Sequence, residues 1–163
     1  MPVISPEAAG GQNVCAFLDM LAWSEGTDWP KQKTANHGYD VVVGGSLFTD
    51  YSKHPNRLIP LPRLKISSTA AGRYQLLYRY WVAYCKILGL KDFSPLTQDK
   101  IALQQIKERR AIPMIQQGRL ADAVKACSNI WASLPGAGYG QHEHKFDTLR
   151  AAYLMAGGNL TGS

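Results

Sequence analysis

The chain has 163 residues, with 18 Lys and Arg against 12 Asp and Glu, so its formal net charge is +6. This length favours a single domain with a hydrophobic core and is too short for two domains of ordinary size. No stretch approaches the ~18 continuous apolar residues of a membrane-spanning helix. The positive charge favours a polyanionic partner, and nucleic acid, anionic lipid and the carboxylate-bearing bacterial cell wall all satisfy that condition.

The N-terminal segment and the cysteines bear on the compartment in which the chain folds. Residues 1–12 are rich in Pro and Gly and have neither the basic start nor the apolar run of a signal peptide or anchor, so we expect a loose N-terminal arm. The three cysteines, Cys15, Cys85 and Cys127, are odd in number and lie in apolar helical contexts. This pattern predicts buried free thiols and a reducing compartment rather than a disulfide framework.

The first strong helix signal lies in the sequence VCAFLDMLAWSEGTD, residues 14–28. Asn13 is placed to cap the start of this helix and Gly26 to end it. Its apolar residues recur at the i, i+3, i+4, i+7, i+8 spacing of an amphipathic helix, and they are Val14, Phe17, Leu18, Leu21 and Ala22. The same row continues to Glu25, so a carboxylate projects from the buried stripe of the helix.

The predicted position of Glu25 changes the proton affinity of its carboxyl group. Partial burial and the negative end of the helix dipole both disfavour the ionised form, so both raise its pKa. A carboxylic acid that stays protonated near neutral pH is what glycosidic cleavage requires, because the sugar oxygen is a poor leaving group until it is protonated. The competing interpretation is a Glu at a frayed helix end, turned toward water.

The next part of the chain predicts a loop and a short antiparallel sheet. Residues 27–39 are polar and contain several turn residues, so we expect a loop beside the acid. Two β-prone runs joined by Gly44-Gly45 predict a β-hairpin over about residues 40–49. A further strand at residues 58–60, with two nearby prolines, is restricted to a sheet edge. Strands and crossover helices do not alternate, so the pattern predicts an α+β fold rather than α/β.

The C-terminal half is predicted to be helical. Ser94 and Pro95 supply the cap and the first-turn proline of one helix, and three more helical stretches follow, at about residues 111–117, 120–134 and 143–156. Before them, an aromatic and apolar stripe ended by Gly89 predicts the central core helix. The members of that stripe are Tyr74, Leu77, Tyr78, Trp81, Cys85 and Leu88.

No pattern in the chain indicates a metal or a cofactor. His142 and His144 are two residues apart at a predicted helix start, where that spacing places them on different faces. Residues 136–140 are glycine-rich but lack the Lys-Ser/Thr of a phosphate-binding loop. We interpret them as a lip that carries Tyr139, whose ring and hydroxyl suit a sugar. Lys and Arg are spread along the whole chain, which argues against a nucleic-acid binder.

A second carboxylate is the open question for glycosidic chemistry. Asp28, Asp40 and Asp50 are candidates to partner Glu25, and Asp40, at the start of the predicted hairpin, is the best placed. The competing interpretation of Asp40, which the pattern favours, is a turn residue that bonds nearby backbone.

Several runs of sequence also resemble a known protein family. They are FLDMLAWSEGTD (17–28), NHGYDVVVGG (36–45), LFTDYS (47–52), AGRYQLL (71–77), LGLKDFSP (88–95), ALQQIKERR (102–110) and SNIWASLPGAGYGQ (128–141). Through these runs the chain closely resembles the lambda-type phage endolysins, a family of lysozyme-like murein lytic transglycosylases. The resemblance implies a lysozyme-like α+β fold, in which a helical bundle and a small antiparallel sheet enclose a cleft.

The resemblance also implies a reaction and a set of site residues. Glu25 would protonate the oxygen of the β-1,4 bond between N-acetylmuramic acid and N-acetylglucosamine. It would then accept the proton of the muramic C6 hydroxyl as that oxygen closes on C1, giving a 1,6-anhydro ring without added water. Gln75 would contact substrate near the acid and Tyr139 would lie beside the scissile bond. Tyr39 and Asp40 would lie on the sheet side of the cleft.

We therefore expect residues 1–163 to form one lysozyme-like catalytic domain, a monomer that degrades peptidoglycan glycan strands and needs no metal or cofactor. The family implies that it accumulates in the host bacterial cytoplasm and reaches periplasmic peptidoglycan after a holin opens the membrane. The nearest alternative is a hydrolytic lysozyme in which Asp40 orients water. A catalytically silent wall-binding module and a basic nucleic-acid binder are the alternatives from other classes.

Overall fold

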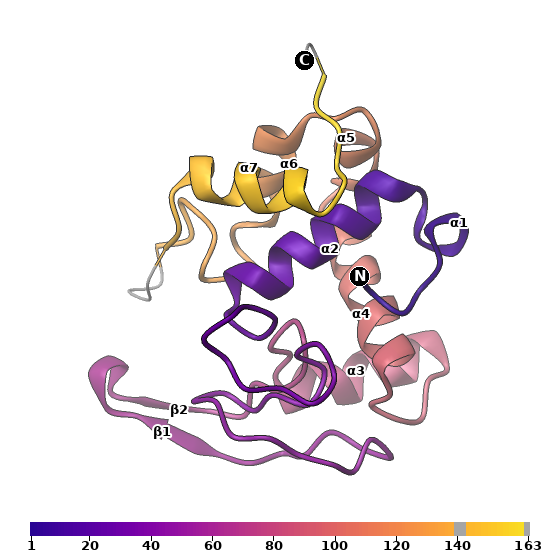
Figure 1. The fold of residues 1–163 in the computed structure, drawn as a ribbon. Helices are drawn as coiled ribbons and strands as arrows, with labels where there is room; N and C mark the ends of the chain where they lie inside the picture. The colour runs from indigo at the N-terminus through magenta and orange to yellow at the C-terminus, as the bar shows by residue number, and fades with distance from the viewer. Residues whose placement is uncertain (139–142, 162–163) are drawn as a thin grey trace.

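The computed structural model describes residues 1–138 and 143–161 (Figure 1). It consists of a group of helices above a small antiparallel sheet, in which Pro60 pairs with Ser67. This content confirms the predicted α+β class. The helices are α1 (Pro6–Ala9), α2 (Gln12–Ser24), α3 (Tyr78–Leu88), α4 (Pro95–Glu108), α5 (Ile112–Gln116), α6 (Leu120–Cys127) and α7 (Phe146–Met155); the strands β1 (Ile59–Leu61) and β2 (Ile66–Ser68) are joined by the 3-10 turn η1 (Pro62–Leu64).

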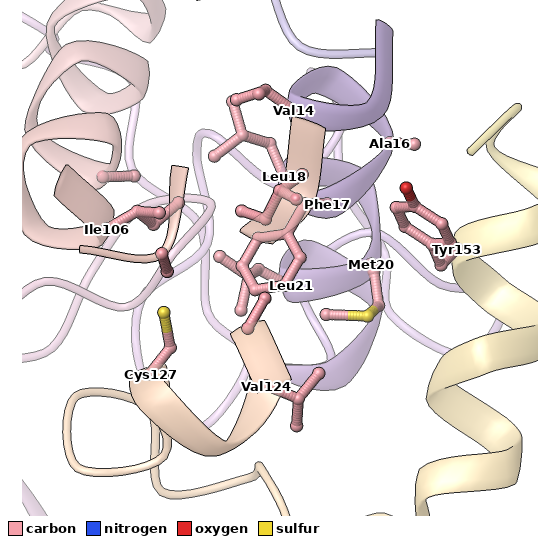
Figure 2. Packing of buried hydrophobic residues seen from close by; sticks show 14 of the residues in the cluster. Val14, Ala16, Phe17, Leu18, Met20, Leu21, Ile106, Val124, Cys127 and Tyr153 are labelled. Carbon is pink, nitrogen blue, oxygen red and sulfur yellow. The ribbon is translucent and has the colours of Figure 1, made fainter. Parts of the chain in front are cut away.

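Helix α2 is the centre of the hydrophobic core. Residues 14–18 and 20–22 are all buried, and the helix packs against α1, α5 and α7. Figure 2 shows α2 between Tyr153 of α7 on one side and Ile106 of α4 on the other. A helix that is apolar nearly all round is stable only when neighbours cover it on every side. The predicted amphipathic stripe is therefore one part of a helix that is buried almost completely.

The prediction that the stripe from Tyr74 to Leu88 forms the central core helix is wrong. Helix α3 begins only at Tyr78, and none of its residues is buried. Trp81 and Leu88 are half-buried against a smaller cluster that includes Phe93. The stripe does mark the inward face of a surface helix, and Gly89 ends that helix in the left-handed conformation, as predicted.

The N-terminal segment is ordered, although a loose arm is expected from its composition. Ser5 caps α1 through a hydrogen bond from the Ala8 N–H. Ile4 is only 6% exposed, and its N–H donates to the Asp99 carboxylate over 2.9 Å. One buried side chain and one buried acceptor far along the chain fix this segment, and neither is visible in local sequence.

The predicted hairpin at residues 40–49 forms only in part. The chain does reverse at Gly44-Gly45, and Val41 bridges Leu47. The ladder stops there because the backbone turns to a distant segment: the Val43 N–H donates to the Ala70 carbonyl over 2.9 Å. The regular sheet is instead the pair β1 and β2, of which the sequence predicts only the first. The expected edge position of that strand is confirmed, since a two-stranded sheet has only edges.

The start of α2 also differs from the prediction. The helix begins at Gln12 with Gly11 at its N-cap position. The Asn13 side chain lies inside the first turn, where it donates to the Ile115 carbonyl and accepts from the Asn159 N–H. Asn13 therefore ties α2 to two distant segments and does not cap its own helix.

The later elements largely agree with the predictions. The Ser94 hydroxyl accepts the Thr97 N–H, and Pro95 opens α4. Helix α6 ends at Cys127 and is therefore shorter than predicted. Trp131 lies beyond the end of this helix but is still buried. Cys15 and Cys127 are buried and Cys85 is half-buried, and all three thiols are free. Within residues 1–138 and 143–161, none of the helices is long and apolar enough to span a bilayer.

Candidate active site

Glu25 lies where α2 ends, and backbone hydrogen bonds fix that end. The Gly26 N–H donates to the Trp23 carbonyl and the Thr27 N–H donates to the Ala22 carbonyl, each over 3.0 Å. This pair of bonds, with Gly26 at φ 75°, is the Schellman arrangement that terminates helices. The predicted role of Gly26 is thus confirmed. The acid consequently projects from a backbone that is rigid on both sides.

Two serines and a histidine form hydrogen bonds at the end of α2 that carries the acid. Ser133 is buried, and its hydroxyl forms hydrogen bonds with the Glu25 carboxyl group and with the Ser24 hydroxyl, the latter at 2.7 Å. The His144 ring is hydrogen-bonded to the Ser24 carbonyl over 2.9 Å, and the backbone N–H of His144 donates to the Ser133 carbonyl over 2.9 Å. Residues near 133 and 144 therefore hold the end of α2 and the acid in one place.

The environment of Glu25 favours the protonated acid. Burial raises the pKa of its carboxyl group and the hydrogen bond from Ser133 lowers it by less, so that the pKa moves from 4.5 to about 7. The side chain is partly exposed, not turned into bulk water. Near neutral pH a substantial fraction of Glu25 thus carries the proton that a general acid must donate.

The raised pKa predicts a pH-dependent cost to stability. The folded state holds the Glu25 proton more tightly than the unfolded state between pH 4.5 and about 7, so stability falls as pH rises through this window and the loss is complete above it. A shift of this size corresponds to about 1–3 kcal/mol once the partial exposure of the side chain is allowed for. Glu25→Gln removes the titrating group, so the variant does not lose this stability as the pH rises. The free energy of unfolding of the variant minus that of the parent should therefore be larger at pH 8 than at pH 5 by that amount.

Urea unfolding at the two pH values measures this difference. Glu7→Gln, which changes an exposed carboxylate in α1, is the matched control and should give the same difference at both pH values. A Glu25→Gln difference that stays constant from pH 5 to pH 8 would show that the acid is ionised and solvated throughout.

A groove of about 950 Å³ opens beside Glu25. This volume is at the upper end of the roughly 300–1,000 Å³ typical of ligand sites. The sheet side, with Leu61, Arg63 and Ser68, forms one wall, and Ile130 and Ala132, from the segment after α6, contribute to another. The predicted cleft between sheet and helical bundle is therefore present, and the acid is part of its lining.

Gln75 is the second predicted site residue that lines this groove. It adopts φ 54°, and its side-chain amide donates to the Gly72 carbonyl over 2.9 Å and to the Val41 carbonyl over 3.3 Å. These bonds fix the side chain at the groove, on the segment that joins the sheet to α3. The structure thus brings Gln75 and Glu25 to one surface.

Tyr39 and Asp40 do not reach the groove, and the expectation that they contact substrate is corrected. Tyr39 is 1% exposed, and its hydroxyl donates to Asp99 over 2.8 Å. Asp40 is 3% exposed, and its carboxylate accepts from the Thr34 hydroxyl and from the Ala35 N–H. Both side chains are therefore structural, and Asp40 bonds nearby backbone as the competing interpretation states.

The other predicted residues either do not line the groove or lie outside the described residues. Asp28 is ion-paired with Arg73. Asp50 is exposed and accepts the Ser52 N–H. Tyr139 and His142 lie outside the described residues.

Sequence reasoning did not find a buried polar network behind the site. Arg73 is fully buried, and its guanidinium donates to Asp19 over 2.7 Å and to the Tyr74 hydroxyl over 3.0 Å. Tyr74 in turn donates to Asp99 over 2.7 Å. The network also reaches the end of α2, since the Thr27 hydroxyl donates to the Arg73 carbonyl over 2.6 Å. A charged and aromatic pair in the run AGRYQLL was the only available signal.

A protonatable carboxyl at the end of a buried helix, in a groove between helices and a small sheet, defines the lysozyme-like class of glycan-cleaving proteins. The family model described as Endolysin matches residues 15–160. The chain belongs to this family of phage enzymes that degrade the bacterial cell wall.

Individual relatives agree with this assignment. The endolysin of Escherichia phage lambda is 68% identical over 146 residues, which cover 89% of this chain and 91% of that protein. The endolysin of Escherichia phage P2 is 50% identical over 167 residues, covering 97% and 98%. The solved structure of bacteriophage lambda lysozyme complexed with a chitohexasaccharide matches with a TM-score of 0.89 and 62% identity, over 98% of this chain and 99% of that chain. These matches confirm the resemblance and the lysozyme-like fold.

Proposed function

We propose that this chain is a lytic transglycosylase, which cleaves the β-1,4 bond between N-acetylmuramic acid and N-acetylglucosamine in peptidoglycan without adding water. The observation that carries the proposal is the composition of the groove: Glu25 is the one carboxylate among the described residues that line it. The lambda relative was solved with a chitohexasaccharide, which supports a glycan strand as the substrate here.

The reaction needs only this one carboxyl group. Glu25 donates its proton to the glucosamine oxygen as the bond from that oxygen to muramic C1 breaks. The muramic C6 hydroxyl oxygen then bonds to C1, and its proton passes to the Glu25 carboxylate. The acid is restored, a 1,6-anhydro ring is formed, and no water is consumed. A pKa of about 7 suits a group that must act first as acid and then as base.

The hydrolytic alternative requires a second carboxylate about 5–10 Å from the first, either as a nucleophile or to orient water. Asp40, the candidate for that role, is buried with both carboxylate oxygens already bonded. Residues 139–142, with the sequence YGQH, contain no carboxylate. These observations favour a nucleophile that belongs to the substrate.

The route to the wall is part of the same proposal. We infer from the family that the chain accumulates in the host cytoplasm and acts on periplasmic peptidoglycan as a monomer after a holin opens the membrane.

Digestion of purified murein in water enriched in oxygen-18 tests the mechanism. The released muropeptides are expected to carry no heavy oxygen at muramic C1, to be lighter by one water than reducing-end products, and to resist borohydride reduction. A hydrolytic muramidase run in parallel provides the control, because its products take up one heavy oxygen and are reduced. Heavy oxygen in the products of this chain would establish the hydrolytic alternative.

A further inference from the structure

A second pocket, of about 410 Å³, adjoins the groove. Gln75, Leu77 and Ile130 line both spaces, so the pocket opens from the groove at the same residue that we place near the acid. Its far wall is formed by α3 and by the end of α4, through residues such as Tyr84 and Arg109. A ligand that occupies the groove and carries a side branch near Gln75 therefore has a second surface within reach.

The far wall is basic and aromatic. The Arg79 guanidinium lies 4.9 Å from the centre of the Tyr80 ring, and Arg79 and Arg109 are both exposed. Within the described part of the chain, neither arginine forms an ion pair. Glu108, the one acid among the described residues that line the pocket, accepts hydrogen bonds from the Tyr84 hydroxyl over 2.6 Å and from the Gln104 amide over 3.2 Å.

This arrangement suits a ligand with carboxylates and short apolar parts. Arginine binds carboxylates through paired N–H donors, and the rings of Tyr80 and Tyr84 offer flat apolar surface with a hydroxyl at the edge. In the described part of the structure Glu108 forms no ion pair with either arginine. A glycan strand without its stem offers at most the single lactyl carboxylate of each muramic acid, which does not use two guanidinium groups.

We propose that this pocket binds the carboxylate-bearing peptide stem of the muramic acid held in the groove, with Arg79 and Arg109 as its charge-recognising residues. The inference rests on the proposed function, because it takes the groove to hold a peptidoglycan strand. In peptidoglycan the stem branches from muramic acid, the sugar on one side of the scissile bond. A stem that leaves the strand beside Gln75 reaches the pocket without leaving the surface of the protein.

The test compares a substrate that carries the stem with one in which the stem is replaced by the lactyl carboxylate that amidase cleavage leaves on muramic acid. Soluble, uncrosslinked glycan strands are used intact, or after an amidase has removed their peptides. For intact strands, the double variant Arg79→Gln/Arg109→Gln should need about ten times the strand concentration to reach half of the maximal rate. This is the effect expected from the loss of two partly solvated ion pairs. The same variant should leave that concentration unchanged for stem-free strands. The charge-reversed pair R79E/R109E should increase the effect on intact strands alone.

Lys86→Gln/Lys100→Gln is the matched control, because both lysines are exposed on the same two helices and neither lines the pocket. It removes the same net charge and should affect both substrates equally and weakly. The proposal is overturned if the arginine variant behaves like this control, or if it weakens cleavage of both substrates to the same degree, which would indicate a glycan subsite.

Product analysis in the same digests separates this proposal from the reaction assignment. Anhydro ends identify the transglycosylase reaction whichever substrate the variants prefer. Reducing ends would refute that reaction, while the ratio between the two substrates would still decide whether the pocket recognises the stem.

Discussion

Glu25→Gln is expected to lower the rate of murein cleavage by roughly 10³-fold, within the range that general acid–base catalysis contributes. Gln is nearly isosteric but has no proton to give to the leaving oxygen and cannot accept one from the C6 hydroxyl. Both halves of the proposed reaction therefore fail at once. The loss of turbidity of a suspension of purified sacculi measures the rate, and near-native circular dichroism shows that the variant folds.

A binding measurement distinguishes this loss of cleavage rate from a loss of affinity for murein. The Glu25→Gln variant should still sediment with murein, because the groove is otherwise unchanged. Glu7→Gln, at an exposed position of α1, should retain the parental rate. If the Glu25 variant cleared sacculi at a rate within tenfold of the parent, the proton donor would have to be another group. If the parent itself pelleted with murein without cleaving it, the chain would be a wall-binding module.

The position of the acid was predictable because it depends on local features. The apolar row that passes through Leu18 and Leu21 is part of the buried surface of α2, and Glu25 follows on that row near a helix end fixed by Gly26. The direction of the pKa shift of the carboxyl group follows from this placement, whereas Ser133, which lowers that pKa, comes from a distant segment. The periodicity and the stop signal therefore sufficed.

The sheet was predicted less well because its pairing depends on distant backbone. The run at residues 40–43 has strong β-propensity, but its Val43 N–H bonds to Ala70 and its Val41 carbonyl accepts the Gly72 N–H. Propensity describes how a residue fits a pleated surface and does not specify the partner strand. The choice between α2 and α3 as the central helix has the same origin, since it depends on which neighbours cover each face.

The residues that contact substrate were the hardest to predict. A run of sequence that matches a known family does not show which of its residues line the cleft and which are buried behind that lining. Tyr39 lies in such a run but contributes its hydroxyl to Asp99. In the run AGRYQLL, Gln75 reaches the groove while Arg73 and Tyr74 turn inward. Which residues of such a run face the groove and which face the interior is decided by contacts with residues that are tens of positions away in the sequence.

Arg73→Met is expected to destabilise the protein by about 3 kcal/mol, the lower end of the cost of removing one partner from a buried ion pair. Arg73 is fully buried, whereas Asp19 and Asp28 are 17% and 29% exposed, so water can partly solvate the carboxylates that lose their partner. The loss also leaves the His37 carbonyl and the Tyr74 hydroxyl without their donor. Methionine fills the volume of the stem, so the measured change reports the polar contacts rather than a cavity.

Chemical denaturation at pH 7 measures this effect, and the surface offers a matched control. Arg119→Met removes the same side chain from the exposed i,i+3 pair with Asp122, whose N–O distance is 2.8 Å, and should change the free energy of unfolding by less than about 1 kcal/mol. Both variants lose one arginine that is ion-paired with aspartate, but Arg73 is fully buried and pairs with two aspartates, whereas Arg119 is exposed and pairs with one. Equal, small effects would mean that the buried guanidinium is no more valuable to the fold than a surface one. A large loss at Arg73 alone would show that this side chain joins α2, the loop that contains Asp28 and the segment behind the groove.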